Sequence, residues 1–385
     1  MISPPTTYVA VDLDAVAHNV SQVLGGLKPG SVLCAVVKAN AYGHGMVPVA
    51  RTCLQAGAQW LGVSTVEEGV ALRGAGIEAP VLVFMPALGD EAQAAVEHNL
   101  TCTVVSSAQV MALQREAERQ GVMARAHVYQ DLGLGRMGGD EPLVDIISAA
   151  EPWPQIEIDG TYAHFGPPGS GVALPAMEWA GAGSSLKTYA AVMFDALKEA
   201  TERRLMFHVA ASGLYCESAD NHFDMVRIGT LLYGQYPDHI SQQHRSLDLR
   251  RTFELRSHIV SICALEKGAR IGYGGEFRCG RRTRIATIPV GFAHGLGMVP
   301  ESVTGRLRTV LKGFVREQDS RRGRTDRLPY ARIGDQRAPL VGRISMDQCC
   351  LDVTELPEVD TGAEVVLPVR RVTCSPAIVR VYEGG

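Results

Sequence analysis

The chain has 385 residues, of which 46% are hydrophobic and 20% are charged, and its formal net charge is −4 at pH 7. This composition indicates an ordinary globular protein with room for about two or three domains. A charge this close to zero argues against a nucleic-acid partner and against binding to an anionic membrane. Met1 to Thr7 lacks the basic and apolar regions of a signal peptide, and no apolar run of about 18 residues occurs, so we expect a cytoplasmic protein.

The chain has 9 cysteines, an odd number, scattered along the sequence and including the adjacent pair Cys349 and Cys350. This is not the pattern of a disulfide framework, so we expect free thiols. No CxxC or HxxxH spacing occurs among the 9 cysteines and 11 histidines, and we therefore expect no zinc site.

The predicted elements begin with a strand at residues 7–12 and a helix at residues 13–27. Short apolar runs then alternate with helical stretches. The runs occupy residues 32–37, 60–64, 80–85, 101–105, 125–130, 156–163, 206–210 and 224–228. Eight strands with helical spacers within about 200 residues predict an α/β fold of the (β/α)8 TIM-barrel type.

After Gly234 the pattern changes to short alternating stretches separated by glycine turns, without a strong helical period. Such a texture is typical of a β-rich domain. We therefore expect the barrel at residues 12–240 and a second, mainly β C-terminal domain at residues 241–385.

Lys38 follows the apolar run of residues 32–37 directly. The C-terminal ends of barrel strands form the active-site face, where partial burial lowers the pKa of an amine and lets it attack a carbonyl. Taken alone, a lysine at a strand end is better explained as a solvated side chain. Tyr42, Gly43 and Gly45 change this interpretation, because they supply a phenol and backbone that can approach a phosphate closely.

The string AVVKANAYGHG at residues 35–45 resembles the lysine motif of the alanine racemase family, fold-type III enzymes that use pyridoxal 5′-phosphate (PLP). Further motifs follow in the family's order, so the resemblance covers nearly the whole chain. It implies that Lys38 binds PLP covalently, that Tyr42 contacts the cofactor, and that residues 1–11 belong to the β-rich domain.

Residues 133–138, GLGRMG, fit the dinucleotide fingerprint GxGxxG, and Asp159 lies in the next predicted strand. Four predicted βα units precede the motif, which favours a barrel over the first unit of a Rossmann fold. Residues 131–138 instead resemble a loop of the racemase family. The resemblance implies that Arg136 holds the substrate carboxylate, a task suited to a forked, permanently charged guanidinium. By itself Arg136 would be taken for a surface arginine.

Three more motifs resemble the family's cofactor site: residues 162–165, 208–212 and 225–234. They imply that His164 lies beside Arg227, and that Ser212 and the amides of Gly229 and Thr230 bind the phosphate. Arg227 would face the pyridine nitrogen and keep it unprotonated, which weakens the ring as an electron sink and favours prompt reprotonation at Cα. Without the resemblance, a histidine at a strand end is more often structural.

Residues 270–277 and 341–348 resemble two motifs of the family's C-terminal domain. They imply that Tyr273 is the second catalytic base and that the Met346 amide contacts the substrate carboxylate. Family members place this domain across a two-fold axis, so the resemblance implies a homodimer with shared active sites. Two bases on opposite faces of Cα are what inversion of configuration requires.

Several departures from the family pattern lie on the substrate side. Tyr129 replaces a lysine that is carbamylated in some members, and Phe292 and Met298 replace a phenol and an arginine of the entrance. Residues 166–185 form a predicted Gly/Pro/Ser-rich loop near the barrel mouth, and residues 316–332 a predicted solvated insertion.

The sequence thus predicts a PLP-dependent amino-acid racemase with a modified substrate pocket, and it leaves the identity of the amino acid open. A PLP-dependent lyase, such as a decarboxylase or aldolase, is an alternative on the same scaffold, because fold does not fix the reaction. A non-catalytic PLP-binding barrel protein is a second alternative. Such proteins typically lack the β-rich domain.

Overall fold

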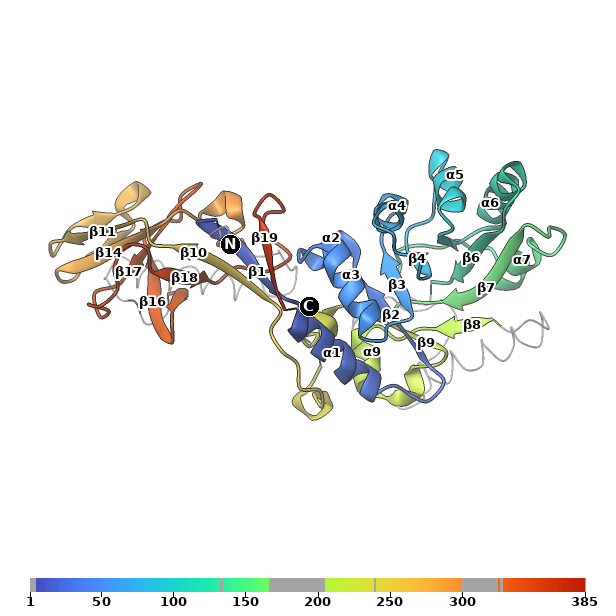
Figure 1. Cartoon of the computed structure of the whole chain (residues 1–385), viewed down its shortest axis with the longest axis horizontal. Coiled ribbons are helices and arrows are strands. Elements are labelled where there is room, and N and C mark those ends of the chain that lie inside the picture. Colours follow the sequence, from blue (N-terminus) through green and yellow to red (C-terminus); the bar gives the residue numbers. More distant parts are fainter. Residues whose placement is uncertain are drawn as a thin grey trace. The chain divides into compact units, whose positions relative to one another are not determined.

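The computed structural model describes residues 5–131, 134–165, 205–238, 240–298, 325 and 328–384. The predicted loop at residues 166–185 and most of the predicted insertion at residues 316–332 lie outside the described residues. The chain divides into two compact units (Figure 1). One comprises Leu13–Thr252 and the other comprises Met1–Asp12 together with Phe253–Gly384.

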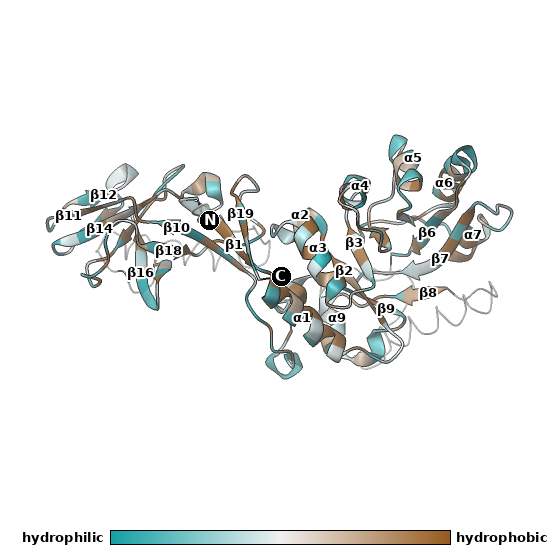
Figure 2. Ribbon diagram, viewed as in Figure 1, coloured by the Kyte–Doolittle hydropathy of each residue, from teal (hydrophilic) through white to brown (hydrophobic). Residues whose placement is uncertain are grey.

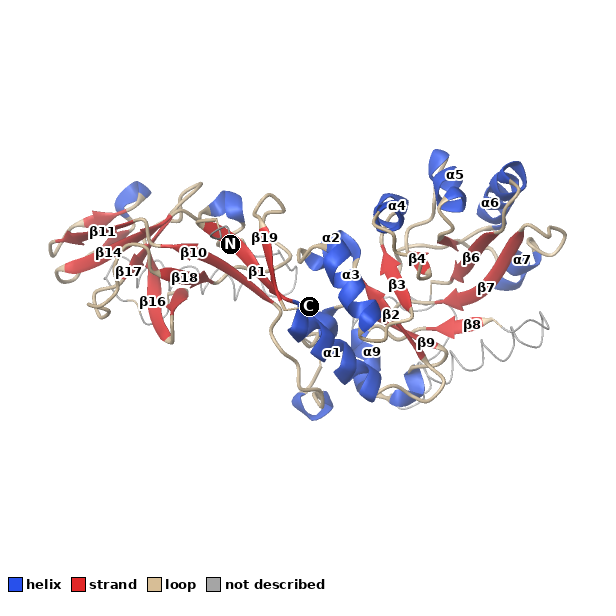
Figure 3. Cartoon of the chain, in the orientation of Figure 1, coloured by secondary structure: helices blue, strands red, loops and turns tan. Residues whose placement is uncertain are grey.

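The first unit is built on eight parallel strands, with a helix between successive strands wherever the structure describes the connection (Figure 3). The strands are β2 (Val32–Val36), β3 (Trp60–Val63), β4 (Val81–Val83), β5 (Thr101–Val104), β6 (Ala124–Tyr129), β7 (Ile156–Tyr162), β8 (Met206–His208) and β9 (Met225–Ile228). Each lies within or next to a predicted apolar run, so all eight predicted strands are confirmed.

The eight strands close into a ring. Their order is β8-β7-β6-β5-β4-β3-β2-β9, and the two end strands of this order are joined by backbone hydrogen bonds. The Asp224 amide donates to the Phe207 carbonyl at 3.1 Å, and the Arg227 amide donates to the Ala210 carbonyl at 2.8 Å. The predicted (β/α)8 barrel is therefore confirmed.

Helices connect the strands, and the longer ones are amphipathic, with hydrophobic and hydrophilic stretches visible in Figure 2. They are α1 (Leu13–Gly25), α2 (Lys38–Tyr42), α3 (Met46–Gln55), α4 (Val66–Gly74), α5 (Asp90–Glu97), α6 (Ser107–Gln120), α7 (Leu143–Ser148) and α9 (Ser212–Glu217), with short 3-10 turns η1 (Ala219–Asn221), η2 (Thr230–Tyr233) and η3 (Gln242–His244). Thr65 and Ser106 cap α4 and α6, because each side chain accepts a hydrogen bond from an amide of the first turn. None of the described helices combines the length and apolar character that crossing a bilayer needs.

The second unit is mainly β, as predicted. Its strands are β1 (Thr7–Asp12), β10 (Phe253–His258), β11 (Ser261–Leu265), β12 (Arg270–Ile271), β13 (Phe277–Arg278), β14 (Thr283–Ile288), β15 (Tyr330–Ile333), β16 (Gln336–Val341), β17 (Cys349–Asp352), β18 (Glu364–Leu367) and β19 (Arg380–Glu383), with 3-10 turns η4 (Tyr273–Gly275) and η5 (Phe292–His294). Nine of these strands form one sheet in the order β11-β14-β17-β16-β15-β18-β10-β1-β19. The N-terminal strand β1 lies between β10, its antiparallel neighbour, and β19, its parallel neighbour.

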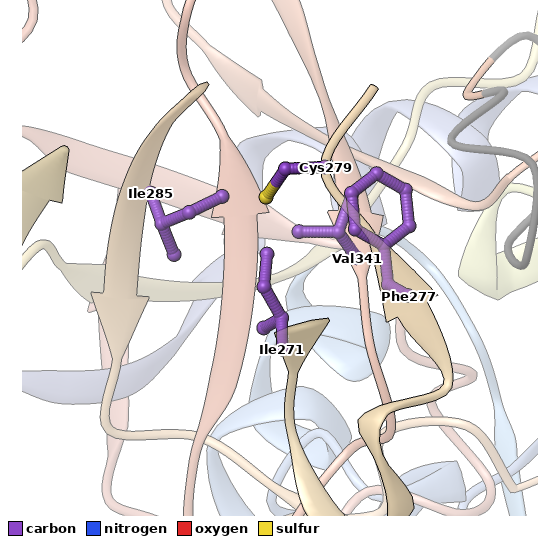
Figure 4. Close-up of a cluster of buried hydrophobic side chains, with 5 residues drawn as sticks. All are labelled: Ile271, Phe277, Cys279, Ile285 and Val341. Carbon is purple, nitrogen blue, oxygen red and sulfur yellow. The ribbon is translucent and has the colours of Figure 1, made fainter. Parts of the chain in front are cut away.

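A compact apolar cluster supports the β12–β13 hairpin of this unit (Figure 4). It consists of the buried side chains of Ile271, Phe277, Cys279, Ile285 and Val341. The cluster packs the two-stranded hairpin against strands of the large sheet. The hairpin is connected through η4, and the cluster therefore anchors the segment that carries Tyr273.

The turn after β2 has an unusual backbone. Four consecutive residues of α2 adopt positive φ angles between 51° and 53°: Ala39, Asn40, Ala41 and Tyr42. This left-handed conformation costs an L-residue about 1–2 kcal/mol. Asn40 tolerates it better than most residues, and its Oδ1 accepts a hydrogen bond from the Met46 amide at 2.8 Å. The Gly43 amide closes the turn by donating to the Ala39 carbonyl at 3.1 Å.

Replacing Ala39 by glycine is expected to raise the free energy of unfolding by up to about 1 kcal/mol, because glycine adopts the left-handed conformation without a steric cost. The Ala39 side chain is exposed, so no packing is lost. The same replacement at Ala71, which is exposed inside the right-handed helix α4, should lower it by about 0.5–1 kcal/mol. Urea unfolding followed by circular dichroism measures both. Equal losses in the two variants would contradict the strain assigned to Ala39.

Candidate active site

A cavity of about 490 Å³ lies at the C-terminal ends of the barrel strands. Eight of the ten sequence-predicted site residues line it: Lys38, Tyr42, Arg136, His164, Ser212, Arg227, Gly229 and Thr230. They come from segments far apart in the sequence, and the barrel brings them together at its active-site face. The other two predicted residues, Tyr273 and Met346, belong to the β-rich unit.

Lys38 follows the buried strand β2 after one further buried residue, Val37, and its side chain lines the cavity. Its ammonium nitrogen lies 5.8 Å from the centre of the Phe84 ring. Burial is the main cause that lowers the pKa of this amine below its ordinary value. The positive charges of Arg136 and Arg227 act in the same direction, and the carboxylate of Glu68 opposes them. The amine is therefore easier to deprotonate than that of a surface lysine.

Glu68 also fixes the backbone next to Lys38. One carboxylate oxygen accepts a hydrogen bond from the Ala39 amide at 2.6 Å, and the other accepts one from the Ser64 amide at 2.7 Å. One side chain at the start of α4 thus joins the loops that follow β2 and β3. This bridge restrains the strained turn that begins at Lys38.

Arg227 projects from β9 into the cavity and is only 4% exposed. Its guanidinium donates to the carbonyls of His208 at 2.9 Å and Ala163 at 2.8 Å. It also lies 4.9 Å from the centre of the Tyr162 ring. Burial lowers the pKa of Arg227 below its ordinary value, but a guanidinium with several acceptors stays charged at neutral pH. The cavity therefore has a fixed cation in its wall.

His164 and Tyr162 are neutral members of the site. Burial, with the nearby charges of Arg227, Arg136 and Lys38, lowers the pKa of His164 to about 3, so its imidazole carries no charge at neutral pH. Burial raises the pKa of Tyr162 to about 12, and its hydroxyl forms a 2.7 Å hydrogen bond with Thr103. His164 and Tyr162 are thus both uncharged at neutral pH, and neither adds a charge to that of Arg227.

Hydroxyl and amide groups gather at one part of the cavity wall. The Ser212 hydroxyl accepts a hydrogen bond from the Gly229 amide at 3.3 Å, and Thr230 follows Gly229 in η2. A Cβ atom on Gly229 would lie 2.5 Å from the Tyr42 hydroxyl, so only glycine lets this phenol approach the backbone. Convergent hydroxyl and amide donors of this kind suit a phosphate.

The residues fit the cofactor that the sequence suggests. The cavity combines an amine of lowered pKa, a fixed guanidinium and a cluster of phosphate-type donors. Its volume lies within the usual range of about 300–1,000 Å³ for small-molecule sites. Gly229 keeps the donor cluster open. The amine, the guanidinium and the donor cluster match, respectively, an aldehyde, a ring nitrogen and a phosphate on one ligand.

Tyr273 and Met346 are exposed in the β-rich unit, by 72% and 67% respectively. Their segments are neighbours there, since Gly272 packs closely against the backbone of Arg343. The Ala293 amide donates to the Met346 carbonyl at 2.8 Å, which brings the turn containing Phe292 to the same place. This unit therefore presents an exposed cluster of sequence-predicted residues.

Sequence reasoning missed several residues of the cavity. Phe84, Met85 and Tyr162 line it, and each lies at or next to the C-terminal end of a barrel strand. That position was an available signal, because side chains at these ends face the active site. Tyr129 is 2% exposed, packs edge-on against Tyr162 at 5.1 Å, and has a hydroxyl without a hydrogen-bond partner among the described residues.

Comparisons with known proteins agree with this geometry. The model of the alanine racemase N-terminal domain matches residues 11–237, and that of the alanine racemase C-terminal domain matches residues 252–377. An alanine racemase of Desulfovibrio desulfuricans is 31% identical over 362 residues, which cover 94% of this chain and 88% of that protein. Alanine racemase 2 of Caldanaerobacter subterraneus is 33% identical over 373 residues, covering 94% and 85%.

Solved structures give the same result. An alanine racemase of Clostridium difficile 630 superposes with a TM-score of 0.81 at 25% identity and covers 99% of this chain and 96% of that one. The alanine racemase from D-cycloserine-producing Streptomyces lavendulae has a TM-score of 0.79 at 26% identity, covering 100% and 98%. With both domain models matched and relatives above 30% identity along its length, the chain belongs to the alanine racemase family of PLP-dependent racemases.

Proposed function

We propose that this racemase inverts amino acids with two bases, Lys38 on one face of the substrate Cα and Tyr273 of the partner subunit on the other. The observation that carries the proposal is the convergence of Lys38, Ser212 and Arg227 on one cavity from three separate strand ends. The lowered pKa of Lys38 supports its role, because a base must release its own proton near neutral pH.

When bound, PLP supplies an aldehyde for covalent attachment to an amine and a conjugated ring that delocalises the electron pair left at Cα. Lys38 holds the cofactor and later moves the proton at Cα. Tyr42, Ser212 and the amides of Gly229 and Thr230 hold the phosphate.

The remaining residues orient the substrate and tune the ring. The Arg136 guanidinium and the Met346 amide bind the substrate carboxylate. Arg227, with His164 close by, faces the pyridine nitrogen and keeps it unprotonated, because a guanidinium donates protons in hydrogen bonds but does not give them up. Because His164 is uncharged at neutral pH, it does not place an acidic imidazolium in this wall that could protonate the pyridine nitrogen.

We also propose a homodimer with shared active sites. Tyr273 and Met346 are mostly exposed in their own unit, which supports their use by another subunit. A cytoplasmic location is proposed as well. All nine cysteines are free thiols, which suits a reducing compartment.

Neither alternative function gains support. The relatives named above are alanine racemases along nearly the whole chain, which does not favour a lyase. A non-catalytic PLP-binding protein would not need the β-rich unit, whereas this chain matches the alanine racemase C-terminal domain over residues 252–377.

Borohydride reduction tests the cofactor site. The purified protein is expected to be yellow, and reduction should fix PLP on Lys38, which mass spectrometry of the peptides would identify. Lys38→Arg should lose the label because arginine does not form this bond. Lys28→Arg, a change at an exposed lysine, should keep it. A colourless protein that takes up no added PLP would refute the assignment.

Subunit mixing tests the shared site. Lys38→Ala and Tyr273→Ala should each be inactive, and mixing them should restore part of the activity, since a heterodimer has one intact pair of bases. Each variant mixed with itself provides the control. If subunit exchange is demonstrated by mass spectrometry and activity does not return, both bases belong to one chain or Tyr273 is not a base.

The preferred substrate is proposed to be a neutral amino acid. It should be larger or less anionic than the substrates favoured by family members that have the usual entrance residues. Phe292 and Met298 make the exposed cluster less cationic and more apolar than the family pattern. Extra apolar contact changes discrimination by only about 1–3 kcal/mol per methylene, so the preference should be moderate.

We therefore expect kcat/KM to be higher for larger neutral amino acids than for alanine, and to shift back toward alanine in Phe292→Tyr and Met298→Arg. Chiral chromatography, which separates the two enantiomers of each amino acid, measures these rates. Met111→Arg, an exposed change on α6, controls for the added charge. A strong preference for alanine that neither substitution alters would remove the altered-pocket proposal and leave the racemase assignment intact.

A further inference from the structure

The hydrogen bonds of Arg227 continue into the barrel interior. Its Nη1 lies 2.7 Å from His208 Nδ1, and His208 Nε2 lies 2.9 Å from His127 Nδ1. His127 Nε2 in turn lies 3.2 Å from Asp159 Oδ1. Both imidazoles are 0% exposed. Asp159, His127 and His208 therefore form a continuous row that ends at the guanidinium, and we refer to these three residues as the relay.

Strand β7 is shaped to let the relay form. It lies between β6, which carries His127, and β8, which carries His208. A Cβ atom on Gly160 of β7 would lie 2.6 Å from three atoms of the His127 ring. Glycine at this position therefore leaves the space through which the two imidazoles meet across the intervening strand.

The pairing register places Asp159. Ala126 of β6 pairs with Ile158, but the next residue, His127, pairs with Gly160, so Asp159 is an extra residue in a β-bulge. A bulge redirects the side chain that it carries. Here it brings Asp159, whose side chain is 30% exposed, beside His127: the buried Asp159 Oδ1 lies 3.2 Å from His127 Nε2, and neither atom has a hydrogen-bond partner of good geometry among the described residues.

The direction of hydrogen-bond donation along the relay follows from the groups at its two ends. A guanidinium only donates, so His208 Nδ1 must accept from Arg227 and the proton of His208 must be on Nε2. That proton is donated to His127 Nδ1, which places the His127 proton on Nε2, facing Asp159. Burial and the charge of Arg227 lower the pKa of His208, in agreement with a neutral ring. The proton of each imidazole is therefore on Nε2, the ring nitrogen nearer the carboxylate along the row.

We propose that the Asp159–His127–His208 relay is a set of positioning residues that holds Arg227 in place toward the ring nitrogen of PLP and compensates its buried charge. Among the described residues, the acceptors of Arg227 are carbonyls and His208 Nδ1, and none of its hydrogen bonds goes to a carboxylate. The relay supplies the negative charge at a distance, because buried hydrogen bonds in a row polarise one another. This inference rests on the proposed cofactor site.

Without the Asp159 carboxylate, neither His127 nor His208 would be held in a single tautomer. If His208 then carried its proton on Nδ1, it would oppose a guanidinium N–H with another donor, and Arg227 would have to move. The relay therefore predicts an effect of Asp159 on the cofactor site although its side chain does not line the cavity.

The test compares Asp159→Asn with Glu157→Gln. Glu157 is the matched control, since it lies two residues earlier on β7, is 51% exposed and pairs with Arg125 at the surface at 3.4 Å. In the apoprotein, 15N-histidine NMR should show His127 and His208 protonated on Nε2, with protons slow to exchange. Asp159→Asn should mix these tautomers and weaken PLP binding by roughly tenfold, the loss expected for one hydrogen bond to a charged group. Glu157→Gln should change neither.

In the holoenzyme, Asp159→Asn should shift the absorption spectrum of the bound cofactor and lower kcat more than it changes KM. Wild-type tautomers and PLP affinity in a folded Asp159→Asn variant would overturn the proposal. If that variant does not fold, the wild-type apoprotein decides, since a proton on His208 Nδ1 is incompatible with the relay. Failure of the wild type to bind PLP at Lys38 would instead refute the cofactor site, while the histidine tautomers would remain measurable.

Discussion

The burial of one positive charge organises the barrel unit. The Arg227 guanidinium is surrounded by protein, and a charge in such a place is stable only when it is thoroughly hydrogen-bonded. Its acceptors are His208 Nδ1 and carbonyls at and beyond the ends of β7 and β8, while its own backbone amide bonds to the Ala210 carbonyl where β9 meets β8. The residue that we assign to the cofactor nitrogen therefore also joins the strands that close the ring, and barrel closure and site formation depend on the same side chain.

The part of the cavity wall around Lys38 depends on strained backbone rather than on a buried charge. Lys38 begins a turn in which four residues adopt left-handed backbone, and Glu68 bridges that turn to the loop after β3. Strained backbone persists only where the surroundings determine it strongly. The combination fixes the direction in which the lysine leaves its strand, and it keeps the amine near Phe84 and away from a fully solvated position.

Local sequence patterns were sufficient for much of this architecture, since apolar runs located all eight barrel strands and Lys38 followed the first of them. Family motifs then located the cavity residues from Tyr42 to Thr230. The relay could not be predicted, because it depends on the register between β6 and β7 and on a bulge that no local pattern reveals. Asp159 entered the sequence argument only as part of a possible dinucleotide fingerprint, whose glycine loop leads into no helix until Leu143. Tyr273 and Met346 rested on resemblance alone, since an exposed tyrosine beside glycines has no signature of catalysis in its own sequence.

The position of β1 has a consequence for how the chain folds as it is synthesised. Val9 pairs with Leu255 on one side and with Arg380 on the other, so this strand is synthesised well before either of its neighbours. The barrel strands, by contrast, pair largely in sequence order and can assemble as the chain lengthens. The nine-stranded sheet is therefore a late product, rich in contacts of long sequence separation, which form slowly. Until then β1 is an apolar segment with two unpaired edges, and a nascent chain that stalls before β10 and β19 are made exposes a strand that is prone to pair with another molecule.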